Sequence, residues 1–137
     1  MAYKPNYPVV GLNHVGSYQV SGEPFASGSI RCSHPNGAQC ITFPYVTRWV
    51  LIVNNDTTNA CRVGFSKNGV DGLVDNFYFR VPAQSDSYVM PPLEVKVTQL
   101  WISGSDDVDI VAGLTGIERQ RTSGSIGPSW SGSFGVG

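Results

Sequence analysis

Short apolar segments, each followed by turn-forming residues, run along most of this chain and set the strongest limit on its fold. The closing residues include Asn-Gly, Asp-Gly and Pro-Pro pairs, which favour turns. A parallel α/β fold would need crossover helices, and no stretch has a convincing helical period. The spacing predicts an all-β antiparallel β-sandwich, with a jelly roll ahead of an immunoglobulin-like arrangement. The predicted strands are residues 18–20, 25–30, 39–43, 48–54, 61–65, 76–81, 87–90, 94–103 and 107–115.

The segment 48–54 is the most apolar of these strands. Its odd-numbered positions from Trp49 to Val53 share one face, while Val50 and Ile52 share the other. Both faces of the strand are therefore apolar, as expected for a strand that is covered on both sides. We expect this strand to lie at the centre of a sheet.

Two further segments depart from simple alternation. In residues 94–103 the apolar phase changes at Thr98 and Gln99, which predicts a β-bulge that bends the strand. Residues 116–121 are the best candidate for a helical turn, although the segment is short and is followed by Gly and Ser.

The chain of 137 residues is the size of one ordinary domain. We expect a β-sandwich over residues 17–121, an extended N-terminal arm over 1–16, and a Gly/Ser-rich, flexible C-terminal tail over 122–137. Large apolar side chains interrupt both arms, so the tail is expected either to bind a neighbour or to fold back on its own domain. The candidate partner-binding residues are Tyr3, Tyr7, His14, Ile126, Trp130 and Phe134.

The charge balance argues against two classes of partner. A net charge of −1, with 14% charged residues, leaves no field that would attract nucleic acid. The longest apolar run, residues 49–53, suits a buried strand and is far shorter than a membrane span. The N-terminus lacks the apolar region of a secretory signal, so the product is expected to stay where it is made.

Three cysteines, Cys32, Cys40 and Cys61, cannot all pair within one chain. We expect free thiols, although Cys32 and Cys40 flank a turn and could face each other across a hairpin. Together with His34 these residues have the ligand types of zinc, but their spacing does not match the usual paired motifs. The sequence therefore predicts ordinary thiols rather than a metal site.

No motif for catalysis is present. His14 and His34 have no nucleophile in a recognisable motif, and no phosphate-binding Gly-rich loop occurs. The acidic turn with Asp106, Asp107 and Asp109 could offer oxygens to calcium, but it lacks the spacing of an EF-hand and reads better as a solvated turn. Paired carboxylates for glycoside cleavage are not evident either, because the candidates fall in turns or at strand ends, namely Glu23, Asp75, Asp86 and Glu94. The prediction is a protein that is not an enzyme, with no catalytic residue, metal or cofactor.

Exposed tyrosines offer one alternative function. Aromatic faces pack on pyranose rings, so a carbohydrate-binding or host-recognition module is the second hypothesis. Partly buried strand residues are the simpler explanation for these side chains, which are Tyr18, Tyr45, Tyr78 and Tyr88.

The order of these features resembles a known group of proteins. Residues 18–28 (YQVSGEPFASG) and 41–49 (ITFPYVTRW), with the aromatic N-terminal arm and the Gly/Ser-rich tail, look like segments of small jelly-roll structural proteins of tailed bacteriophage virions, of the capsid cement or decoration type. The resemblance implies a virion protein on the capsid surface, assembled in the host cytoplasm. It further implies contacts to the major capsid protein and to copies of itself as a dimer or trimer, with the arms as lattice-binding parts. For the second hypothesis it implies a carbohydrate-binding or host-recognition module of a phage fibre or spike.

Overall fold

A computed structural model describes residues 12, 13, 15, 22–33, 37–71, 77–84, 90–119, 122, 135 and 136 of the chain. In this part of the chain antiparallel strands dominate and one short helix occurs, as the turn-rich sequence predicts. The elements are β1 (Glu23–Ile30), β2 (Gln39–Thr42), β3 (Tyr45–Asn54), β4 (Cys61–Gly64), α2 (Lys67–Asp71), β5 (Tyr78–Val81), β6 (Gln99–Ser103) and β7 (Val108–Glu118).

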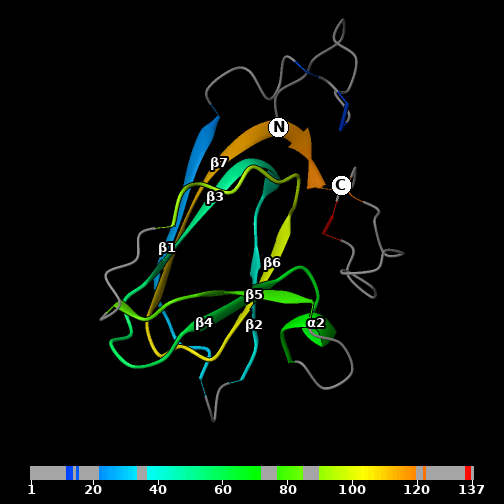
Figure 1. Cartoon of the computed structure of the whole chain (residues 1–137). Coiled ribbons are helices and arrows are strands. Elements are labelled where there is room, and N and C mark those ends of the chain that lie inside the picture. Colours follow the sequence, from blue (N-terminus) through cyan, green and yellow to red (C-terminus); the bar gives the residue numbers. More distant parts are fainter. Residues whose placement is uncertain are drawn as a thin grey trace, which may run out of the picture.

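The strands form two sheets (Figure 1). One sheet has three strands in the order β1-β7-β3, and the other has four in the order β2-β6-β4-β5. All pairings are antiparallel. The prediction of an all-β, sandwich-like fold is confirmed at this level.

Alternate side chains from both sheets meet in one apolar core. Inward residues of β3, β7, β4 and β6 are almost fully buried and belong to a single cluster, so the two sheets cover each other as alternation requires. Phe25 and Phe43 meet edge to face at 4.9 Å between ring centroids. The largest fully buried side chains include Phe43, Ile52, Leu100, Ile102, Ile110 and Ile117.

The chain crosses from one sheet to the other at a corner. The link between β2 and β3 lies beside Thr98, whose carbonyl accepts a hydrogen bond from Phe43 N (2.8 Å). The strand β3 then runs beside residues 93–97, with a hydrogen bond from Val50 N to Leu93 O (2.8 Å). Regular pairing of β6 with β2 starts only at Gln99. The phase change predicted at Thr98 and Gln99 therefore marks this corner. The predicted strand 94–103 is too long at its start, because β6 begins only at Gln99.

Three further predictions are wrong. Among the regular strands of the three-stranded sheet the central one is β7, not β3 as predicted. The other side of β3 bonds to residues 93–97, which form a bridge and single hydrogen bonds rather than a regular strand of the described part. Residues 116–118 continue β7 instead of forming a helical turn, because Tyr45 of β3 pairs with Glu118. A helix occurs instead at α2, where a turn was expected from Asn68-Gly69.

Local contacts explain α2. Ser66 caps it, since its hydroxyl accepts a hydrogen bond from Gly69 N (3.1 Å). Its Val70 packs over β4, where a Cβ on Gly64 would stand 2.7 Å from a Val70 methyl carbon. The helix therefore covers part of the outward side of the four-stranded sheet.

Candidate interaction surfaces

The outward side of the three-stranded sheet is apolar, and this surface is called the outer face below. In the register of the sheet, Trp49 lies opposite Gly113 and Leu51 lies opposite Val111, while their neighbours on that side of β1 are the exposed Pro24 and Ala26. Val53 follows on β3 and is 40% exposed. The outer face consists of Pro24, Ala26, Trp49, Leu51, Val53 and Val111.

The indole of Trp49 lies over Gly113, its neighbour on β7, which has no side chain. A Cβ on Gly113 would come within 2.8 Å of the indole Cε2 of Trp49. Gly113 therefore makes room for the ring, and a larger residue would push it off the sheet. The glycine fixes an aromatic ring on the outer face.

A bulge in β3 places charge beside this ring. The register of β3 on β7 shifts between Thr47 and Trp49, so Arg48 is the additional residue. Arg48, Trp49, Pro92 and Glu94 line an open hollow of about 560 Å³. The apolar outer face thus has a charged, hollowed rim, a combination found at protein interaction sites.

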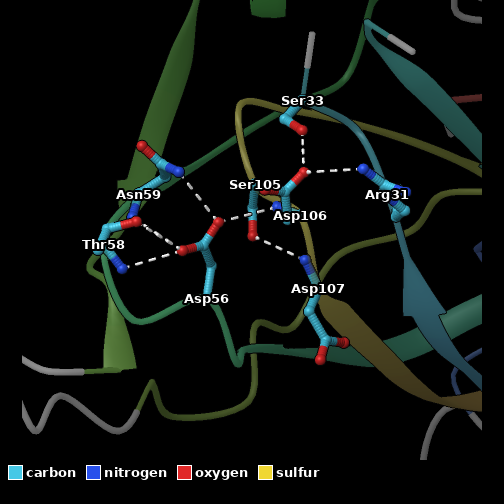
Figure 2. A network of polar contacts seen from close by, with 8 residues as sticks. All are labelled: Arg31, Ser33, Asp56, Thr58, Asn59, Ser105, Asp106 and Asp107. Carbon is cyan, nitrogen blue, oxygen red and sulfur yellow. Dashed lines mark hydrogen bonds and ion pairs between the residues drawn. The ribbon is translucent and has the colours of Figure 1, made fainter. Parts of the chain in front are cut away.

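At the opposite end of β3, Asp56 holds several loops together (Figure 2). Its Oδ1 accepts hydrogen bonds from Thr58 N (2.9 Å), Thr58 Oγ1 (3.1 Å) and Asn59 N (3.1 Å). Its Oδ2 accepts from Asn59 Nδ2 (3.1 Å) and from Asp106 N (3.0 Å). The backbone hydrogen bonds from Thr58 and Asp106 lower the pKa of Asp56 well below its usual value, so this side chain is a structural anion.

The acidic residues considered for calcium point to separate partners. Asp106 Oδ1 accepts a hydrogen bond from Ser33 Oγ and lies 3.8 Å from a guanidinium nitrogen of Arg31 (Figure 2). Asp109 accepts from Ser29 N (2.9 Å) and from Asn55 Nδ2 (2.8 Å). Among the described residues no group of three potential metal ligands converges. The turn interpretation of this acidic segment fits these contacts.

All three thiols are free, as the sequence predicts, and the two that lie in one cluster are not the two that flank the turn. Cys32 and Cys61 are buried in the same core cluster, where the thiol of Cys61 donates a hydrogen bond to Arg62 O (3.7 Å). Cys40 contacts Thr42 on β2. The interaction with the Cys61 thiol lowers the pKa of Cys32, and the interaction with Cys32 together with burial raises the pKa of Cys61.

A glycine bulge sets the position of Cys32. Gly104 has a φ of 96°, its N–H donates to Cys32 O, and Cys32 N donates to Ser105 O, which is the pattern of a G1 bulge. Cys61 begins β4, which pairs with β6 just before this bulge. Sequence spacing could not reveal the thiol pair, because it depends on strand order.

The two described tyrosines of the carbohydrate hypothesis, Tyr45 and Tyr78, lie on different sheets and do not form one platform. Tyr45 begins β3 in the three-stranded sheet, while Tyr78 begins β5 in the four-stranded sheet. The guanidinium carbons of Arg62 and Arg80 stand 5.4 and 5.2 Å from the ring centroid of Tyr78. The ring of Tyr78 is therefore in cation–π contact with two neighbours. Tyr18 and Tyr88 lie outside the described residues.

The residues predicted to bind a partner also lie outside the described part of the chain. These are Tyr3, Tyr7, His14, Ile126, Trp130 and Phe134, and the same holds for His34 of the zinc hypothesis. The outer face was missed from the sequence, although its signal was present: the apolar odd-numbered positions of residues 48–54 were interpreted as buried.

Comparison with known proteins adds no relative: no family model, no curated protein and no solved structure matches this chain. Within the described residues, no helix has the length and apolar character needed to cross a membrane.

Proposed function

We propose that this chain is a non-enzymatic structural protein of a phage virion, of the cement or decoration type that the sequence resembles. In this role it binds the major capsid protein and copies of itself, at the capsid surface, as a dimer or trimer. The arms outside the described residues remain part of the proposal as lattice-binding segments.

The finer fold assignment belongs to this proposal, and the strand order supports it. Residues near Leu93 bridge to β3 at Val50, so they can be counted as a sixth strand. With that strand included, β6 and β7 become the seventh and eighth, and the two sheets have the orders 1-8-3-6 and 2-7-4-5. These orders match those of a jelly roll, an architecture that occurs in viral capsid proteins as well as in lectins and cupins, and the match supports the assignment.

The outer face is the observation that carries the proposal. A side chain such as Val53 at 40% exposure is unremarkable alone, but six apolar positions gathered on one sheet are typical of a surface that another protein covers. The space between the sheets is filled by large side chains such as Phe43 and Ile52. The chain therefore presents its apolar recognition surface outside the sandwich, as a building block does.

Sedimentation velocity on the full chain tests the proposal. Val53→Lys places a charge on the outer face at a position that is already partly exposed, opposite Asp109, so folding is expected to persist. Thr42→Lys on the exposed outward side of β2 is the matched control. We expect the native chain and the control to associate, and Val53→Lys to dissociate at least tenfold more readily. Equal association of all three proteins would remove the outer face from the proposal.

Binding to particles provides the second arm of the test. The native chain added to purified phage heads that lack it should co-sediment with them at a stoichiometry set by the capsid lattice. A chain that stays in the supernatant at every concentration would count against a capsid partner.

A further inference from the structure

The last residues of the chain return to the sandwich at its corner. Gly135 O accepts a hydrogen bond from Thr98 N (2.6 Å), and Val136 forms an antiparallel bridge with Val97. Val136 also packs against the apolar core, and Gly135 is buried. Gly135 and Val136 therefore pair with residues 97 and 98 through one antiparallel bridge and one backbone hydrogen bond.

The site beside Val97, Thr98 and Gln99 that holds Gly135 and Val136 is called the corner slot below. It accepts only glycine at position 135. A Cβ on Gly135 would stand 2.7 Å from the backbone N of Gln99 and 2.6 Å from its Cγ. The backbone cannot retreat without breaking the start of β6, so only a glycine brings the next residue into the bridge with Val97. The corner slot thus recognises a Gly-Val strand by backbone pairing and one apolar side chain.

The segment that connects Thr122 to Gly135 begins and ends at the same residue of the sandwich, Thr98. Thr122 Oγ1 lies 3.1 Å from Thr98 Oγ1, the residue whose N–H binds Gly135. Between Thr122 and Gly135 lie residues 123–134, of which eight are Gly or Ser. A connection of this length reaches up to about 40 Å when extended, more than it needs for a return to the same residue.

On the basis of the proposed function as an assembly protein, we propose that the corner slot of one copy binds Gly135 and Val136 of a neighbouring copy in the assembled state. The contacts made between copies would be identical to those made within one chain, so exchange loses no interaction. Binding within one chain wins as long as the concentration of neighbouring copies stays below the effective concentration that a short linker provides, which is on the order of millimolar. Copies held side by side on a lattice exceed that concentration, and exchange then links neighbours.

A cysteine pair reports which chain fills the corner slot. Val97 and Val136 are directly opposed in the bridge, a spacing that a disulfide can span. Val97→Cys/Val136→Cys is made in a Cys40→Ser background, because Cys40 is the half-buried native thiol. After mild oxidation, a non-reducing gel separates a cross-link within one chain from a covalent dimer or ladder.

The expected result is a cross-link within the chain at micromolar concentration and covalent dimers or ladders at millimolar concentration or in assembled particles. Gly135→Val in the same background is the control, and it should abolish both products because its side chain does not fit beside Gln99. Cross-links confined to single chains under all conditions would overturn the exchange. If sedimentation still shows oligomers in that case, the exchange fails while the proposed function stands; if the chain is also monomeric, both fail.

Discussion

Asp56→Asn tests whether the carboxylate in Figure 2 holds the loops at this end of the sandwich. In the native protein Oδ2 accepts from Asn59 Nδ2 and from Asp106 N. An amide at position 56 either turns its NH₂ group toward these two donors or gives up the three hydrogen bonds to Oδ1. A hydrogen bond to a charged group contributes about 1.5–3 kcal/mol, and these bonds are only part-buried, so the free energy of unfolding should fall by about 2–4 kcal/mol at pH 7.

Urea unfolding measures this loss. With a slope of about 1–3 kcal/mol per molar urea, the midpoint should fall by about 1–2 M. Asp71→Asn on α2, a carboxylate outside the Asp56 network, is the control and should shift the midpoint by much less.

The pH dependence gives an independent check. The pKa of Asp56 is lower in the folded chain than in the unfolded chain, so its stabilising contribution is complete above the unfolded value, near 4. That contribution is lost as the pH falls below 4 toward the folded pKa. The difference in the free energy of unfolding between the native protein and Asp56→Asn should therefore become smaller below pH 4. A difference that is absent at pH 7, or that stays constant down to pH 2, would refute the role given to this carboxylate.

Three further predictions concern the sheets and the core. Gly113→Val should displace the indole of Trp49 and lower stability by about 1–3 kcal/mol, with a blue or red shift of tryptophan fluorescence in the folded protein; an unshifted spectrum would contradict the packing. Ser29→Gly should raise the thermal midpoint, because Ser29 has a φ of 55° and glycine adopts this conformation without strain; the stabilisation should be up to about 1 kcal/mol. Cys32 and Cys61 should resist a thiol reagent until the chain unfolds, because both are buried, and rapid labelling of either in the folded protein would show that this part of the core is open.

Strand positions were largely predictable because alternation is a local property. Predicted segments such as 25–30 and 61–65 coincide with β1 and β4 to within a few residues. Strand order is not local, so the partner of Cys32 and the central place of β7 could not be read from spacing. The helical turn expected at 116–121 failed for the same reason: pairing of Glu118 with Tyr45 extends β7, whatever the local preference of these residues.

The outer face shows a different limit of sequence reading. Apolar side chains on both faces of residues 48–54 are expected when both faces are buried within one chain. They are equally expected when one of the two faces is buried against a second protein. The alternation alone does not separate these cases. The sheet order separates them, because it puts Val50 and Ile52 inside the sandwich. The face with Trp49, Leu51 and Val53 is the one that no described residue of the chain buries.

The molar mass of the full chain in solution, with and without a charge on the outer face, bears most directly on the claim that this sandwich is a building block. The account predicts a dimer or trimer for the native chain and for Thr42→Lys, and a shift to monomer for Val53→Lys with unchanged secondary structure. A native chain that remains monomeric at high concentration and binds no phage particle would contradict it.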